Sequence, residues 1–256
     1  NDAISDLDDE KKNILVKSLD NINDFFQVQR IRKTNPVRQK MLSPIMIGDL
    51  RLPVPIFQGG MGIGVSLNRL AAAVAMEGGV GVISAANPGF LEPDFRTDPR
   101  EANIRALGRQ IRPAVEAIKD IPNRGLIGVN IMCAIQQYED MVRTAVEAGA
   151  DLIISGAGLP THLPALVKDS KIKLIPIVSS ASAAAVIIKS WAKKYDRAPD
   201  AVIFEGPDAG GHLGFKKDQI EDAQKNFYQT LAEIKEEIQN IPNCPLIAAG
   251  GIYSRE

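Results

Sequence analysis

The feature that most constrains the fold of this chain is an alternation of short apolar runs with longer helical stretches, which begins at Pro44. Such alternation predicts an α/β protein with a parallel sheet, right-handed helical crossovers and strands that are buried on both faces. The strand candidates are residues 54–57, 80–84, 126–131, 152–155, 174–178, 201–205 and 246–249, and the helix candidates are residues 66–77, 101–119, 136–148, 161–168, 181–194 and 219–239.

Two architectures fit this order of elements: a doubly wound open sheet and a TIM-type (β/α)8 barrel. Glycine or polar residues follow nearly every strand candidate. In a barrel these strand ends meet in a ring at the face that carries the active site, whereas an open sheet concentrates such residues at one switch point. The distribution along the whole chain therefore favours the barrel.

About seven strands do not close a barrel, which needs an eighth strand with its helices. Because the sequence ends at Glu256, soon after the seventh strand candidate, we expect a C-terminally incomplete barrel that belongs to a longer polypeptide. This barrel domain would occupy residues 44–256.

Residues 1–43 differ from the rest because they are rich in charge and carry one apolar stripe at helical spacing. They predict an N-terminal helical extension that packs on the barrel or on a partner subunit, as in a homodimer, and a disordered tail is the alternative. The stripe consists of Leu15, Leu19, Ile22 and Phe26.

Composition excludes several classes of function. The formal net charge of −1 and the sparse aromatic residues give no support to binding of nucleic acid or of an anionic membrane. No apolar run reaches the ~18 residues that span a bilayer. The two cysteines, Cys133 and Cys244, show neither metal-ligand nor CxxC spacing, so we expect reduced thiols, no metal site and a cytoplasmic protein.

The loop that follows strand candidate 201–205 is the strongest candidate for chemistry. It reads EGPDAGGHLG over residues 205–214 and holds one of the two histidines in the chain, His212. Glycines such as Gly210 and Gly211 let the backbone approach a ligand, and histidine titrates nearest neutral pH. The loop therefore predicts a site that binds a flat ligand and moves a proton on it, although a histidine satisfied by neighbouring backbone is the structural alternative.

Three other strand ends carry polar or glycine-rich signals. The loop 58–64 fails the GxGxxG spacing of a dinucleotide site, which leaves a glycine-lined wall beside a ligand or a tight turn. Asn130 can pair with the edge of a heterocycle or cap the next turn. Glu205 can accept hydrogen bonds from ligand hydroxyls or tie two loops together, and Gly250-Gly251 suits a phosphate.

Together, these motifs resemble the nitronate monooxygenase (2-nitropropane dioxygenase) family, which also contains the FMN-dependent enoyl-[acyl carrier protein] reductases. The likeness extends from about residue 44 to residue 252. It is carried by five motifs in order: IFQGGM (56–61), GVNI (128–131), SGAG (155–158), EG with AGGH (205–206 and 209–212) and IAAGGI (247–252).

The resemblance implies a TIM-type barrel that binds FMN at its carboxyl-terminal face and acts on a small-molecule substrate. Gly59, Gly60 and Met61 would line the flavin ring, and Asn130 would form a hydrogen bond with it. Gly250 and Gly251 would hold the phosphate. The residues around the ring or the ribityl chain would be Glu205, Gly210 and Gly211, and His212 matches the active-site histidine of the family.

Two functions follow from this resemblance. The first is oxidation of alkyl nitronates or nitroalkanes by O₂ to a carbonyl compound and nitrite. The second is reduction of an enoyl thioester by NAD(P)H through FMN, with the same histidine orienting the thioester or the cofactor. A third hypothesis, of another class, is a non-catalytic subunit of a larger assembly that binds a flavin or a phosphate ligand and docks through the N-terminal helix.

Overall fold

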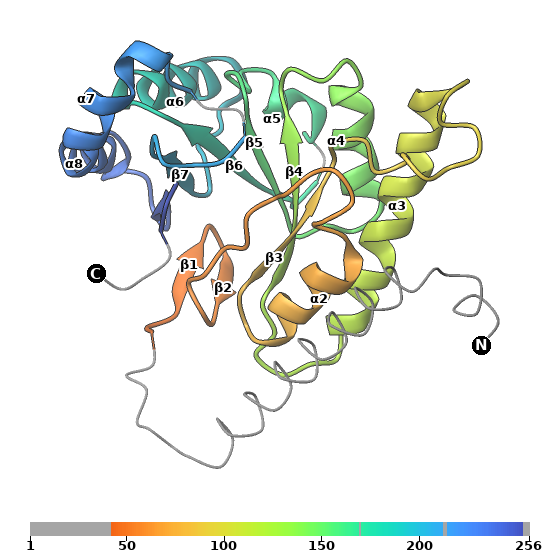
Figure 1. The fold of residues 1–256 in the computed structure, drawn as a ribbon. Helices are drawn as coiled ribbons and strands as arrows, with labels where there is room; N and C mark the ends of the chain where they lie inside the picture. Colours follow the sequence, from red (N-terminus) through yellow and green to blue (C-terminus); the bar gives the residue numbers. More distant parts are fainter. Residues whose placement is uncertain (1–41, 169, 212–213, 253–256) are drawn as a thin grey trace, which may run out of the picture. The chain divides into compact units, whose positions relative to one another are not determined.

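A parallel sheet of six strands forms the centre of the computed structural model, which describes residues 42–168, 170–211 and 214–252 (Figure 1). Each strand pairs with its neighbours in the sequence, in the order β3-β4-β5-β6-β7-β8. This order has no reversal point, so the sheet is the wall of a partial TIM-type barrel and not a doubly wound sheet. The strands are β3 (Val80–Ser84), β4 (Leu126–Met132), β5 (Leu152–Gly156), β6 (Lys173–Val178), β7 (Val202–Glu205) and β8 (Leu246–Ala249).

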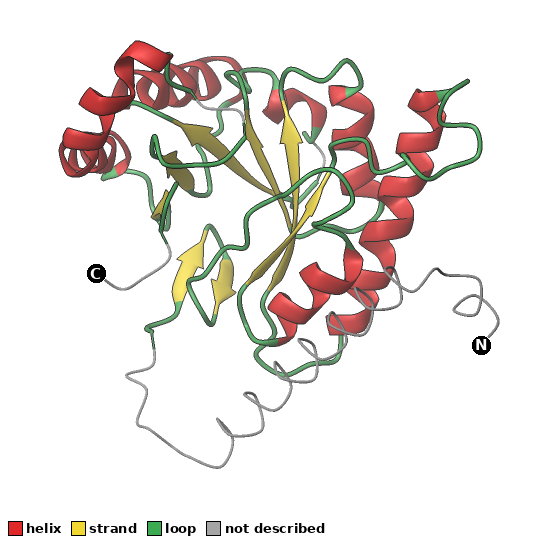
Figure 2. Ribbon diagram, in the orientation of Figure 1, coloured by secondary structure: helices red, strands yellow, loops and turns green. Residues whose placement is uncertain are grey.

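The helices lie around the outside of the strand layer (Figure 2). Capping side chains start two of the longest ones: Asp98 accepts a hydrogen bond from the Glu101 N–H, and Ser180 accepts one from the Ala183 N–H. Among the described residues, no helix is long and apolar enough to cross a membrane. The helices are α2 (Asn68–Met76), α3 (Pro99–Ile118), α4 (Tyr138–Glu147), α5 (Leu163–Leu166), α6 (Ala181–Tyr195), α7 (Ile220–Lys225) and α8 (Phe227–Ile238), with a 3-10 helix, η1 (Lys217–Gln219).

Side chains of the strands alternate between two buried clusters, as the pleat of a β-strand requires. The outer cluster joins the strands to the helices and includes Ile83, Val129 and Ile153 of β3, β4 and β5. The inner cluster includes Val82 and Leu126 and fills the concave side of the sheet. A strand residue is therefore assigned to the helix side or to the barrel interior by its place in this alternation.

An antiparallel hairpin that the sequence analysis missed covers part of the inner cluster. It consists of β1 (Ile45–Ile47) and β2 (Leu50–Leu52), joined by a two-residue turn in which Gly48 has φ 58°. Ile47 and Leu52 are fully buried in the inner cluster. An ion pair between Asp49 in the turn and Lys173 at the start of β6 ties the hairpin to the amino ends of the strands.

The predicted strand 54–57 was wrong, because only Phe57 makes a bridge, to Val80 at the free edge of β3. Pro53 and Pro55 flank Val54, and proline has no N–H to donate to a sheet. The segment nevertheless follows the edge of β3: the Val80 N–H donates to the Ile56 carbonyl at 2.8 Å. It lies where a first barrel strand would lie but does not form one.

Two predicted helices were also wrong in their extent. The stretch 161–168 is helical only over α5, which has four residues and starts next to a proline. The stretch 219–239 is divided at Asn226 into α7 and α8. The N-terminal extension predicted for residues 1–43 lies outside the described residues as far as residue 41.

Candidate functional site

Two polar side chains point into the barrel where strands end. In β4, Asn130 lies on the same face as Leu126, which belongs to the inner cluster. In β7, Glu205 lies on the same face as Ile203, another member of that cluster. Glu205 is the last residue of β7, and Asn130 lies two residues before the end of β4. Both are therefore near the carboxyl ends of the strands, where barrel enzymes place their active sites.

The glycine-rich loop after residue 58 lies over β4 and brings two predicted site residues together. A methyl group placed on Gly60 would lie 2.5 Å from Cβ and 3.0 Å from Nδ2 of Asn130. Only a residue without a side chain permits this approach. The loop therefore forms a wall next to the Asn130 carboxamide, and Met61 at its end is exposed.

The carboxamide of Asn130 makes no hydrogen bond to any residue in the described part of the chain. The sequence left open whether this side chain caps the next turn, and no such bond is present in the described ranges. Its donor and its acceptor are therefore both available to a ligand that enters from the carboxyl ends of the strands.

The carboxyl group of Glu205 is half-buried, and burial raises its pKa above the ordinary value of 4.5. Within residues 42–168, 170–211 and 214–252, no side chain donates a hydrogen bond to it and no cation pairs with it. Hydrogen bonds from ligand hydroxyl groups would stabilise a carboxylate in this position, because they would replace the hydrogen bonds to water that it lost on burial.

We expect Glu205 to make stability depend on pH. Because the folded protein holds this proton more tightly than the unfolded chain, its contribution to the free energy of unfolding is present at low pH and is lost as the pH rises above 4.5. The Glu205→Gln variant lacks this loss. Urea unfolding should therefore show the stability of the variant, relative to wild type, increasing as the pH rises above 4.5.

The matched control for this experiment is Glu236→Gln, because Glu236 is an exposed glutamate of α8. Its stability difference from wild type should stay nearly constant over the same pH range. A Glu205→Gln difference that is equally flat would contradict the assigned burial of the carboxyl group.

Glycine residues follow the carboxyl ends of β7 and β8 and allow the two segments to approach each other closely. A methyl group placed on Gly250 would lie 2.6 Å from the Gly206 carbonyl oxygen, and Gly250 and Gly251 have φ angles of 87° and 80°. Their backbone N–H groups donate to no acceptor among the described residues. Asp208 borders Gly251, and its carboxylate accepts a hydrogen bond of 2.6 Å from Gln224 in α7.

Three predicted site glycines leave open space beside the backbone. A methyl group on Gly59, Gly210 or Gly211 would meet nothing within 4 Å among the described residues. His212 lies outside the described residues, so its role remains a prediction from the sequence. The other histidine, His162, is exposed next to α5, with its Nδ1 3.0 Å from the Thr161 hydroxyl oxygen.

Two residues that shape the loop over β4 were not predicted from the sequence. Gln58 and Ser66 hold the backbone of residues 59–61 through side-chain hydrogen bonds. Gln58 precedes the glycine pair directly, and a long amide at the end of an extended segment was the signal available in the sequence. Ser66 is fully buried and had no distinguishing pattern around it.

Neither cysteine has the properties of a catalytic thiol. Burial raises the pKa of Cys133, and it raises the pKa of Cys244 to about 12. Both thiols are therefore protonated at neutral pH, and neither forms a disulfide.

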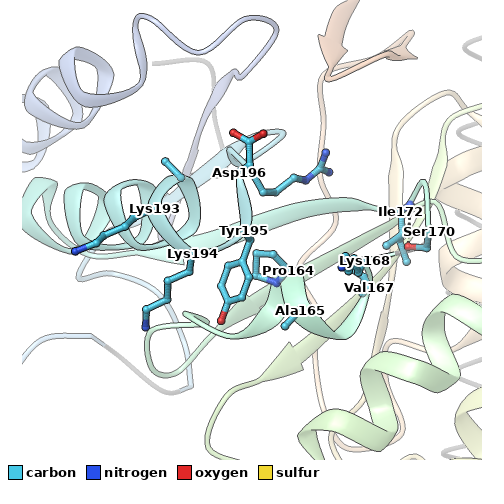
Figure 3. Close-up of a pocket in the computed structure, with 12 residues that line it drawn as sticks. Pro164, Ala165, Val167, Lys168, Ser170, Ile172, Lys193, Lys194, Tyr195 and Asp196 are labelled. Atoms are coloured by element: carbon cyan, nitrogen blue, oxygen red, sulfur yellow. Dashed lines mark hydrogen bonds between the residues drawn. The ribbon is translucent and has the colours of Figure 1, made fainter.

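A pocket of about 620 Å³ lies at the opposite ends of the strands (Figure 3). The last turn of α6 and the loop before β6 line it, and none of the predicted site residues does. Lys193 and Lys194 stand in the last turn of α6, where cations favour the helix dipole, and Figure 3 shows Lys193 extending away from Pro164. In TIM-type barrels, residues at the amino-terminal face contribute to stability and the active site lies at the opposite face. We therefore assign no chemistry to this pocket.

Comparison with known proteins shows which family the chain belongs to. The family model described as nitronate monooxygenase matches residues 43–256. The structure of FabK from Thermotoga maritima shares 29% sequence identity, with a TM-score of 0.52 over 77% of this chain and 51% of that one. A search of curated proteins found no match.

A nitroalkane oxidase from Streptomyces ansochromogenes has the same fold, with 21% identity and a TM-score of 0.56 over 78% of this chain and 59% of that one. The match to FabK covers 51% of that protein, so the chain spans about half the length of FabK. Since the family model covers nearly all of the residues that the barrel occupies, the chain belongs to the nitronate monooxygenase family.

Proposed function

We propose that this chain holds FMN at the carboxyl ends of its strands and serves the oxidation of alkyl nitronates by O₂ to a carbonyl compound and nitrite. The observation that carries the proposal is the family match over residues 43–256. The arrangement of Gly60 against Asn130 at the mouth of the partial barrel supports it, because a flat heterocycle needs both a wall and an edge partner.

The residues present fit FMN in four respects. The Asn130 carboxamide can pair with the edge of the isoalloxazine ring, and the half-buried Glu205 carboxyl group can accept from the ribityl hydroxyls. The N–H groups of Gly250 and Gly251 suit the phosphate. The open space beside Gly59, Gly210 and Gly211 leaves room for the ring and its chain.

When bound, FMN supplies the electron transfer between the organic substrate and O₂. The protein would bind the flavin and the substrate and orient them relative to each other. His212 would hold the nitro oxygens of a nitronate or remove the α-proton of a neutral nitroalkane, for which an imidazole is suited near neutral pH. Met61 and the glycines before it would keep the substrate on one face of the ring.

A second candidate is reduction of an enoyl thioester by NAD(P)H. One observation favours it: the first loop exposes Met61, Ile63 and Val65 to 46%, 51% and 54%. An apolar surface of this kind next to the flavin wall would suit an acyl chain. His212 would then orient the thioester.

Anaerobic reduction of the flavin separates the two candidates. The full-length protein should be yellow, with the absorption spectrum of bound FMN, and a propyl nitronate should bleach it rapidly while NADH and NADPH do so slowly. Rapid bleaching by a nicotinamide alone would favour the reductase. A yellow protein that no substrate bleaches would favour a flavin-binding subunit, and a colourless protein that refuses added FMN would refute all three.

A further inference from the structure

The free edge of β3 is completed in an unusual way. Up to residue 58 the backbone pairs with it: the Val80 N–H donates to the Ile56 carbonyl, and the Gln58 N–H donates to the Val80 carbonyl at 3.0 Å. The next residue of β3 whose backbone groups face this edge is Val82, and no backbone group of the described residues pairs with it there. A strand edge left unpaired at this point would carry an unsatisfied donor and acceptor.

The side chain of Gln58 supplies the missing partner. Its Oε1 accepts from the Val82 N–H at 3.0 Å, and its Nε2 donates to the Val82 carbonyl at 3.1 Å. A carboxamide has the same donor and acceptor as a peptide group, so it pairs with Val82 as a strand residue would. The backbone is therefore released from the sheet one residue early and can turn at Gly59 toward the barrel mouth.

Ser66 fixes the other end of the same loop. Its hydroxyl is fully buried, accepts from Gln58 Nε2 at 2.8 Å and from the Met61 N–H at 2.9 Å, and donates to the Gly59 carbonyl at 3.1 Å. The Ser66 carbonyl accepts from the Ser84 N–H at 2.9 Å. Gln58 and Ser66 thus clamp residues 59–61 onto β3.

The clamp determines where the wall of the candidate site lies. The contact of Gly60 with Asn130 leaves no room for the loop to move closer to β4, and the two side chains prevent it from moving away. The N–H groups of Gly59 and Gly60 donate to no acceptor within the described part of the chain, so they remain available at this wall.

We infer that Gln58 and Ser66 are positioning residues, which set the wall on which the flavin ring lies before the flavin binds. The inference rests on the proposed function, because it assigns the wall to FMN. Neither side chain is placed to touch the reacting atoms. Their effect passes through the backbone of residues 59–61, and a pre-arranged wall lowers the cost of binding.

The test uses Ser66→Ala and the near-isosteric Gln58→Glu in the full-length protein. Ser66→Ala removes the acceptor of the Met61 N–H but keeps the pairing of Gln58 with Val82. The matched control is Gln110→Leu, because Gln110 also accepts from a backbone N–H, that of Asn68, but makes no hydrogen bond to residues 59–61 in the described ranges.

Three readouts are compared: hydrogen exchange of the apoprotein, FMN affinity measured by flavin fluorescence, and the midpoint potential of the bound flavin. In Ser66→Ala, exchange at Met61 should accelerate and FMN affinity should fall, each roughly tenfold, while exchange in α3 stays unchanged. The midpoint potential should shift in both variants but not in Gln110→Leu.

Unchanged exchange at Met61 in Ser66→Ala would overturn the inference, and so would normal FMN affinity and potential in both variants. Accelerated hydrogen exchange in α3 would show that a variant has lost its fold. The inference is then judged on the other variant alone. If wild type itself binds no FMN, the proposed function fails. If wild type binds FMN and the variants bind it equally well, the inference alone fails.

Discussion

Replacement of His212 by alanine is expected to leave FMN bound and to lower turnover of nitroalkanes by about 10²- to 10⁴-fold, the usual value of a general base. The α-proton of a neutral nitroalkane must pass to a group that is unprotonated near neutral pH, and the chain offers only two imidazoles. The measurement is nitrite release and O₂ consumption by the full-length enzyme, with the flavin content determined from its absorption spectrum.

The matched control is His162→Ala, because His162 is the other histidine and is exposed beside α5. Its turnover should equal that of wild type. Supplying the preformed nitronate should restore part of the activity of His212→Ala if the residue acts as the base. Wild-type turnover in His212→Ala would refute the role, and loss of the flavin would make His212 a binding residue.

The Trp191→Ala variant is expected to lose about 3–5 kcal/mol of the free energy of unfolding. Trp191 of α6 is fully buried in the outer cluster, and its Nε1 donates to the Pro160 carbonyl at 3.0 Å. The substitution leaves a large cavity between helix and sheet and removes the donor that this buried carbonyl requires. Urea unfolding followed by far-ultraviolet circular dichroism measures the effect.

The Trp191→Phe variant separates the two contributions, because it keeps most of the ring volume but removes the N–H. We expect it to lose about 1–3 kcal/mol, the cost of one unpaired buried group. Equal losses in both variants would show that the cavity contributes little. A loss below about 1 kcal/mol in Trp191→Ala would contradict the packing described for this helix.

The six strands of the sheet were predictable because their signals are local. Apolar runs such as 246–249 end in glycine, and the structure has a strand over the same residues. The first strand failed because Val54 lies between two prolines, so that a side chain, Gln58, had to complete the edge of β3. The hairpin before it was missed although two apolar triplets flank a two-residue turn at Gly48.

The candidate site was predictable in part for the same reason. Strand ends in a barrel point to one face, so Asn130 and Glu205 could be placed there without coordinates. The contact of Gly60 with Asn130 and the clamp by Ser66 depend on segments that are distant in the sequence, and no local pattern reveals them. The role of His212 rests on its motif alone.

The hairpin at the amino ends of the strands has a practical consequence for engineering. Ile47, Leu52 and the Asp49–Lys173 pair stabilise the barrel at the end opposite to Asn130 and Glu205. Libraries aimed at heat tolerance can therefore be confined to the hairpin and its supports, while those aimed at substrate scope vary the loops that follow the strands. Improvements from the two libraries should combine additively, because the two sets of residues lie at opposite ends of the strands.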